Sequence, residues 1–141
     1  MKFQELYESK KGTVEDALSY IRSNDAICLA GDCNEPTVFC SNLHKIAPRM
    51  ENVTVLKART GNFDSGDGMN GHINTGGFFY GPSWKVGHQK LNTSLIVTDL
   101  PDFARFVADY RPANVFVGQV TPMDENGNFQ IGLCMMWEPD S

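Results

Sequence analysis

The stretch "DAICLAGDCNEPTVFC", from Asp25 to Cys40, decides the fold class of this chain of 141 residues. Its first part, DAICLA, is a short apolar run whose length is typical of a fully buried strand. The next part, GDCNEP, interrupts the run and leads to Pro36, which suits the first turn of a helix. NVTVLKA, at 52–58, is rich in β-branched residues and predicts another strand. This order predicts a βαβ unit with two parallel strands.

The loop from Gly31 to Pro36 is placed where open α/β sheets bind ligands, beyond the carboxyl end of a strand. Backbone N–H groups at the start of the following helix could receive a carboxylate. The alternative is that Gly31 only permits the chain to turn there. The position of the loop points to function independently of any family.

The remaining chain extends the same pattern. TVEDALSYIR begins with Thr13 as a helix cap and Asp16 three residues later. SLIVTDLPDFARFVADY predicts a strand and then a helix that begins near Pro101, and ANVFVGQV predicts another buried strand. We therefore expect an α/β fold in one domain, 1–141, with a mainly parallel sheet flanked by helices on both faces.

A hairpin is predicted near the end of the chain, in QVTPMDENGNFQIG at 119–132. Asn126-Gly127 is typical of a type I′ turn, in which both central residues have positive φ. Asp124 is expected to hold the turn through hydrogen bonds to backbone, a role favoured over acid/base catalysis. Gln119, on the preceding strand, either donates to an acyl oxygen or points outward, and the second possibility is favoured.

A glycine-rich stretch at 59–90 contains eight glycines and shows little periodicity. Such a stretch is usually a functional loop or a flexible segment. Its G-x-G-x-x-G motif at 66–71 has no strand directly before it and no helix directly after it, so a dinucleotide site is not indicated. A calcium loop is excluded because Thr75 stands where the twelfth-position glutamate is required.

The charge and hydropathy patterns exclude two classes of partner. The formal net charge is −5, and no basic stripe is present that could neutralise the phosphates of a nucleic acid. No apolar run approaches the ~20 residues that cross a membrane. The first residues lack the apolar core of a signal peptide, so we expect a cytoplasmic protein.

The cysteines do not indicate a metal site. Cys33, Cys40 and His44 have a C-x6-C-x3-H spacing, which lacks the short knuckle of a structural zinc site. Cys28 lies in an apolar run and Cys40 on an apolar helix face, so both are expected to be buried, reduced thiols.

RPANVFVGQVTPMDENGNFQIG, at 111–132, resembles the signature of the acetyl-CoA hydrolase/4-hydroxybutyrate (butyryl-CoA:acetate) CoA-transferase family. In that family a strand ends in a Ser/Thr-Pro pair and an Asp-x-x-Gly turn follows. GDCNEP is similar to the family's glycine loop, NTGGFFYG to its segment rich in Phe and Gly, and TVEDALSYIRSNDAICLAG to its opening helix and strand. Thr121-Pro122-Met123-Asp124 and Gly127 match the signature. Asp124, Gly127 and Asn128 also resemble the D-x-x-G-N turn of the wider class I CoA-transferases. Gly31 and Pro36 are the positions that match the glycine loop.

The resemblance implies that this chain is the N-terminal domain only. Family members are much longer and consist of two similar α/β halves with the active site between them. The catalytic glutamate, which forms a glutamyl-CoA thioester, and the main CoA-binding segments lie in the C-terminal half. We therefore expect no catalytic residue in this chain, no metal and no cofactor, with coenzyme A as a substrate.

The implied function is half of an acyl-CoA:carboxylate CoA-transferase for short-chain acids such as acetate, butyrate or 4-hydroxybutyrate, inactive alone. The alternatives are a stand-alone module that binds a small carboxylate or a CoA-like ligand, a fragment of an acetyl-CoA hydrolase, and an assembly subunit without a ligand. The candidate substrate-binding residues are Gly31, Glu35, Pro36, Gln119, Thr121, Pro122, Met123, Asp124, Gly127 and Asn128.

The expected partners are a C-terminal CoA-transferase domain, an acyl-CoA and a short-chain carboxylate. A half-enzyme would expose the apolar face on which the missing half docks, and such a face would favour a homo-oligomer. Phe78, Phe79 and Trp84 are the candidates for that face.

Overall fold

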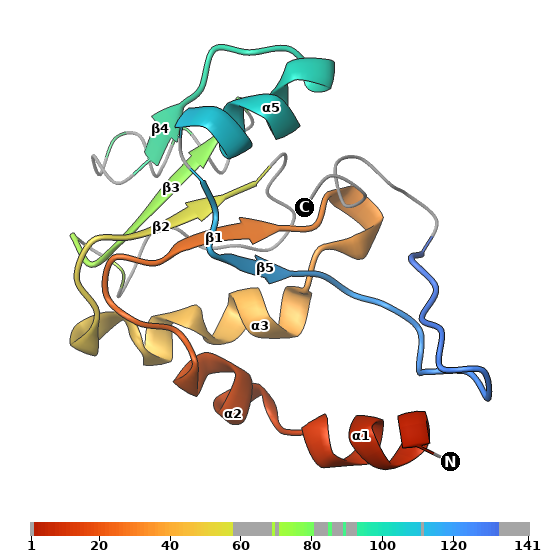
Figure 1. Ribbon diagram of the computed structural model, residues 1–141. Helices are drawn as coiled ribbons and strands as arrows, with labels where there is room; N and C mark the ends of the chain where they lie inside the picture. The colour runs from red at the N-terminus through yellow and green to blue at the C-terminus, as the bar shows by residue number, and fades with distance from the viewer. Residues whose placement is uncertain are drawn as a thin grey trace.

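The structure is a computed structural model that describes residues 2–57, 69, 71–80, 85, 89, 93–110 and 112–132. Helices, short 3-10 turns and strands alternate along this part of the chain (Figure 1). The elements are α1 (Lys2–Lys10), α2 (Val14–Ser19), β1 (Ala26–Leu29), η1 (Asp32–Asn34), α3 (Thr37–Asn42), η2 (Leu43–Lys45), η3 (Ala47–Arg49), β2 (Val53–Leu56), β3 (Ile73–Gly77), β4 (Thr93–Leu95), α5 (Leu100–Tyr110) and β5 (Val115–Val117).

The described strands form one five-stranded sheet in the order β4-β3-β2-β1-β5, and every neighbouring pair is parallel. β1 lies between β2 and β5, with Ile27 paired to both Val55 and Val115. Helices α2 and α3 cover one face of the sheet and α5 covers the other (Figure 1). The predicted α/β architecture with helices on both faces is therefore confirmed.

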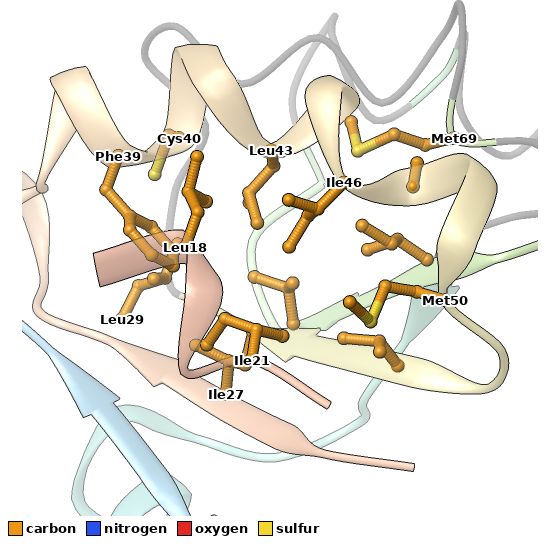
Figure 2. Close-up of a cluster of buried hydrophobic side chains, with 14 residues drawn as sticks. Leu18, Ile21, Ile27, Leu29, Phe39, Cys40, Leu43, Ile46, Met50 and Met69 are labelled. Atoms are coloured by element: carbon orange, nitrogen blue, oxygen red, sulfur yellow. The ribbon is translucent and has the colours of Figure 1, made fainter. Parts of the chain in front are cut away.

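The larger core lies between the sheet and the α2/α3 layer. Figure 2 shows Phe39, Leu43 and Ile46 pointing from the α3–η3 segment toward Ile27 and Leu29 of β1. Since alternate residues of a strand face opposite sides, Ile27 and Leu29 share one face and Cys28 faces the other. The expected apolar face of the second helix is thus largely confirmed.

The smaller core joins α5 to the opposite face of the sheet. Phe103 and Val107 of α5 pack with Cys28 of β1 and Leu56 of β2, and all four are buried. The spacing of Phe103, Phe106 and Val107 predicts the apolar side of this helix, and the prediction is confirmed because Phe106 also packs against the cluster.

Hydrogen bonds at the amino end of the sheet hold β1 and β5 together. The buried carboxylate of Asp25 accepts from the backbone N–H of Arg22 at 2.7 Å and from Nδ2 of Asn114 at 2.8 Å. The side-chain oxygen of Asn114 accepts from the N–H of Ala26 at 2.8 Å. Both the nitrogen and the oxygen of the Asn114 side-chain amide therefore help to align the two strands.

The glycine-rich stretch was expected to be a loop, and this expectation is wrong for 73–77, which form β3. The strand carries little apolar surface of its own, so its sequence lacks the usual signal. Gly76 allows close packing, because a Cβ atom there would lie 3.1 Å from the side chain of Leu56 and 3.4 Å from that of Ile96. Residues 59–68 of the stretch lie outside the described residues.

Three other expectations need correction. The sequence predicts a helix that begins at Pro36 and is ended by Pro48, but α3 ends at Asn42 and 3-10 turns continue it. The spacing of Val38, Phe39, Leu43 and Ile46 predicts an apolar face on this helix, but Val38 is 64% exposed. β5 was expected to be buried but is an edge strand, with Phe116 43% exposed. The capping box of α2, in contrast, is confirmed.

Within the described residues, no helix has the length and apolar character needed to cross a membrane.

Replacing Phe103 by alanine is expected to lower the free energy of unfolding by about 3–5 kcal/mol, because the ring is fully buried between α5 and the sheet. Urea denaturation would measure the change. Tyr20→Ala is the control, because Tyr20 is 78% exposed and its loss should cost no more than about 0.5 kcal/mol. Equal effects of the two substitutions would contradict the described packing of α5.

Candidate functional site

The carboxyl ends of β1, β2 and β5 meet at one edge of the sheet, where η1 and the start of α3 also lie (Figure 1). The loop that follows β1 closes on itself, with the N–H of Asn34 donating to the carbonyl of Gly31 at 3.0 Å. The N–H of Gln119, beyond β5, donates to the carbonyl of Asn34 at 3.1 Å. Three predicted site residues, Gly31, Glu35 and Pro36, are therefore brought together with Gln119, as expected from the strand order.

The loop after β1 is packed into the protein. Gly31, Asn34, Glu35 and Pro36 are all buried, whereas Gln119 is exposed. Gly31 is not among the described glycines with positive φ, so a left-handed backbone is not the reason for a glycine there. Gln119 acts through its backbone here, and its exposed side chain agrees with the outward orientation that was favoured.

A charged residue that the sequence reading missed lies at the same edge. The N–H of Lys57 donates to the carbonyl of Gly76 at 3.0 Å, which continues the pairing of β2 with β3. Strand alternation places its side chain on the face of Val53 and Val55, toward α3. Only 2% of Lys57 is exposed. Sequence reasoning could have found Lys57 from its spacing, because it follows Val53 and Val55 at every second position and so shares the inward-facing side of an otherwise apolar strand.

Lys57, Glu35 and Cys40 interact electrostatically from three different elements. Burial lowers the pKa of Lys57 to about 7, and the negative charges of Cys40 and Glu35 partly oppose that shift. Burial raises the pKa of the Cys40 thiol to about 12; Glu35 adds to the increase and Lys57 opposes it.

A cavity of about 400 Å³ opens beside this edge. It lies where the starts of α2 and α3 meet the chain leaving β5. Two predicted site residues, Pro36 and Gln119, line it, and so do Thr13, Phe39 and Gly118. Its lining combines apolar residues with polar ones such as Thr37, a composition that is typical of small-molecule sites.

The hairpin is present, with an antiparallel bridge between Val120 and Ile131, but its turn is not type I′. Gly127 has a φ of +87°, whereas Asn126 is not among the described residues with positive φ. The N–H of Gly127 donates to the carbonyl of Asp124 at 3.2 Å, and the N–H of Asp124 to the carbonyl of Asn128 at 2.9 Å. This is a three-residue connection with glycine in the left-handed position, in which only Gly127 needs positive φ.

The expected structural role of Asp124 is confirmed. Its Oδ1 accepts from the N–H groups of Asn126 at 2.9 Å and Asn128 at 2.8 Å. The bond from Asn128, together with the others, holds the pKa of Asp124 below its usual value. These bonds use the carboxylate to shape the turn.

The tip of the hairpin lies against α1 and not beside the loop after β1. The rings of Tyr7 and Phe129 make an edge-to-face contact at 5.7 Å, and a Cβ atom on Gly127 would lie 3.1 Å from the ring of Phe3. The predicted site residues thus divide into two groups. Those at the tip are Asp124, Gly127 and Asn128; Thr121, Pro122 and Met123 lie on the extended segment leading to it.

The aromatic residues expected on a docking face differ in their environments. Phe78 packs against Phe103 with ring centroids 4.4 Å apart, and its neighbour Phe79 is 44% exposed. Trp84 lies outside the described residues. Among the residues that are described, no group of three His, Cys, Asp or Glu side chains could hold a metal ion.

Replacing Gly127 by alanine is expected to separate α1 from the hairpin, because the new Cβ atom would press on Phe3 at a positive φ. Nuclear Overhauser contacts between the rings of Tyr7 and Phe129 would then be lost. Gly71→Ala is the matched control, since Gly71 also has a positive φ, +77°, but nothing within 4 Å of the added atom. Contacts that survive Gly127→Ala would show that the packing is looser than described.

The described cysteines should differ in reactivity, because Cys33 is exposed whereas Cys28 and Cys40 are buried. At pH 8, iodoacetamide should modify Cys33 rapidly and leave the other two largely unmodified. Cys28 is shielded by its burial, and the Cys40 thiol, whose pKa is about 12, is in addition almost fully protonated there. Peptide mass spectrometry would measure each rate. Modification of Cys40 as fast as Cys33 would be the contrary result.

A scan against protein-family models and a search of curated proteins both find no match. Among solved structures, the chain is similar to RipA from Yersinia pestis, with a TM-score of 0.84 and 21% identity over 94% of this chain and 34% of RipA. It is also similar to a 4-hydroxybutyrate CoA-transferase from Porphyromonas gingivalis, with a TM-score of 0.67 and 16% identity over 98% of this chain and 32% of that enzyme. The chain spans about a third of the length of these proteins. Its fold is a CoA-transferase-like α/β fold.

Proposed function

We propose that this chain is the N-terminal domain of an acyl-CoA:carboxylate CoA-transferase that acts on short-chain acids such as acetate, butyrate or 4-hydroxybutyrate. The observation that carries the proposal is the likeness of nearly the whole chain to one third of a 4-hydroxybutyrate CoA-transferase. The Thr-Pro and Asp-x-x-Gly motifs of the sequence, Thr121-Pro122 and Asp124 to Gly127, support the same family.

The arrangement of the carboxyl edge also supports the proposal. Parallel α/β sheets bind ligands at this edge, and the loop from Gly31 to Pro36 lies there with Lys57 and Gln119. CoA transfer requires a carboxylate nucleophile, donors for a developing oxyanion and a site that excludes water. The buried loop and its backbone N–H groups could supply part of the wall and some of the donors. The nucleophile and the main contacts to coenzyme A would come from a C-terminal domain.

The proposed partners follow from the groups that each domain would supply. The chain would associate with a C-terminal CoA-transferase domain and form a homo-oligomer in the cytoplasm, and its substrates would be an acyl-CoA and a small carboxylate. Exposed apolar side chains are available for such contacts, among them Phe79 and Tyr80. If water took the place of the acceptor acid in the reaction, the same domain would be part of an acetyl-CoA hydrolase.

The cavity of about 400 Å³ favours a second candidate, a stand-alone module that binds a small carboxylate or a CoA-like ligand. Its lining residues lie at the starts of α2 and α3 and beyond β5. Such a module would bind its ligand as a stable monomer, without a second domain.

The test replaces the matched third of the Porphyromonas gingivalis enzyme by this chain and measures CoA transfer from butyryl-CoA to acetate. We expect turnover by the chimera, together with a borohydride-trapped glutamyl adduct, and no turnover by this chain alone. The control is the same enzyme without its matched third, which should be inactive.

Two outcomes would overturn the proposal. Turnover by this chain alone would place the whole reaction in it, and Glu35 and Glu125 would be the first residues to mutate. A chimera that melts cooperatively and binds butyryl-CoA but transfers nothing would show that the fold is shared without the function.

A further inference from the structure

The cavity of about 400 Å³ is lined by three parts of the chain that are far apart in the sequence. These are the start of α2, the start of α3 and the chain that leaves β5, which lie on the same side of the molecule (Figure 1). Most of the lining residues are apolar or glycine, and the polar ones are Thr13, Thr37 and Gln119. The residues of this lining therefore indicate which chemical class of ligand the cavity can hold.

None of the described residues that line the cavity carries a charge. Acidic residues adjoin the lining, since Glu35 precedes Pro36 and Asp16 is bonded to Thr13. The N–H and the hydroxyl of Thr13 donate to Oδ2 of Asp16 at 2.8 and 2.9 Å, and these bonds hold the pKa of Asp16 below its usual value. A carboxylate bound in the cavity would thus have no cation in the lining and a negative charge nearby, and both disfavour its binding.

Two neutral polar side chains of the lining are available to a ligand. The hydroxyl of Thr13 is already used, because it donates to Asp16 and accepts from the N–H of Asp16 at 3.2 Å. No hydrogen bond is described for the Thr37 hydroxyl or for the side-chain amide of Gln119, and both residues are exposed. A hydroxyl and a carboxamide together offer donors and acceptors that match an amide or an ester.

The apolar part of the lining favours a ligand with an alkyl chain. Val38, at the start of α3, is 64% exposed, and Ala17 of α2 is exposed as well. Covering such surfaces contributes about 25 cal/mol per Å² of apolar area removed from water. Acetate is too small for this, because a water molecule takes up about 30 Å³ of the liquid and acetate has the size of only a few water molecules.

The walls of the cavity are held in place without a ligand. The capping box of Thr13 and Asp16 fixes the start of α2. The N–H of Gln119 donates to the carbonyl of Asn34 at 3.1 Å, which connects the chain beyond β5 to the loop before α3. Beyond the cavity, α1 and the hairpin meet through the rings of Tyr7 and Phe129. A ligand would therefore enter a site that is already formed, which lowers the entropy cost of binding.

We propose that this cavity binds an uncharged, chain-shaped ligand in which a short alkyl chain is joined to an amide or ester group. The alkyl chain would lie over Ala17, Val38 and Phe39, and the amide or ester would bond to Thr37 and Gln119. A free short-chain acid does not suit the cavity, and a CoA-like ligand would occupy it only through an uncharged part. An uncharged ligand requires only that the cavity is a ligand site, as in the second candidate above. CoA transfer by the chimera therefore neither supports nor excludes such a ligand.

Hexanamide and hexanoate are a matched pair of probes, because they have the same chain and the same number of heavy atoms and differ in charge. Each is titrated into the isotope-labelled chain at pH 7 and followed through backbone amide shifts. We expect hexanamide to cause saturable shifts at Thr13, Thr37, Val38 and Gly118. Hexanoate should bind there about tenfold more weakly or less, since its carboxylate finds no cation in the lining.

Three substitutions test the location of the site. Ala17→Leu fills the cavity from an exposed position of α2 and should abolish the shifts caused by hexanamide. Ser19→Leu is the matched control, because Ser19 is exposed on the same helix but is not among the lining residues, and binding should not change. Thr37→Val keeps the shape and removes the hydroxyl, so affinity for hexanamide should fall about two- to tenfold. Thermal melting confirms that each variant is folded.

Three results would overturn the proposal. Hexanoate could bind at these residues as tightly as hexanamide, which would make the cavity a carboxylate site. The shifts caused by hexanamide could survive Ala17→Leu, which would place the ligand elsewhere. Hexanamide could also cause no saturable shifts up to its limit of solubility, which would show that the cavity does not hold a ligand of this class.

Discussion

The parallel pairing of β1 with both β2 and β5 is the constraint on which the rest of the structure depends. Its register, with Ile27 opposite both Val55 and Val115, aligns the three strands so that their carboxyl ends share one edge. The loop after β1, Lys57 after β2 and the chain that leaves β5 therefore meet without being close in the sequence. The burial of β1 on both faces makes this register costly to change.

The amino and carboxyl ends of the sheet differ in how their buried charged side chains are stabilised. At the amino end, the carboxylate of Asp25 accepts hydrogen bonds from the backbone of Arg22 and the side chain of Asn114, and these bonds connect β1 to β5. At the carboxyl end, Lys57 is buried at a cost that its interaction with Glu35 offsets only in part, so its pKa lies near neutrality. Perturbed titratable groups gather at functional sites more often than elsewhere. The difference agrees with a structural role for the first edge and a functional one for the second.

The sequence predicts those parts of the fold whose signals are local. The unit from β1 to β2 is confirmed, because each of its segments has a clear local signal of secondary structure. These signals are a continuous apolar run, a proline at a helix start and a β-branched run. β3 was missed because its residues, INTGG, carry almost no hydrophobic pattern and are buried through contacts that neighbouring strands provide. α1 was not predicted, since much of its apolar surface, including Phe3, stays exposed. Lys57 was missed because its importance lies in its burial, which depends on α3 and the β1 loop packing over the end of β2.

The most direct measurement is a titration of the isotope-labelled chain with butyrate and acetate, followed through backbone amide shifts. The account predicts that shifts concentrate at Gly31, Glu35, Lys57 and Gln119, and that Lys57→Met weakens them. Shifts confined to the hairpin tip and α1, around Asp124 and Phe3, or no shifts at the carboxyl edge with either acid, would contradict the claim that this edge is the functional site.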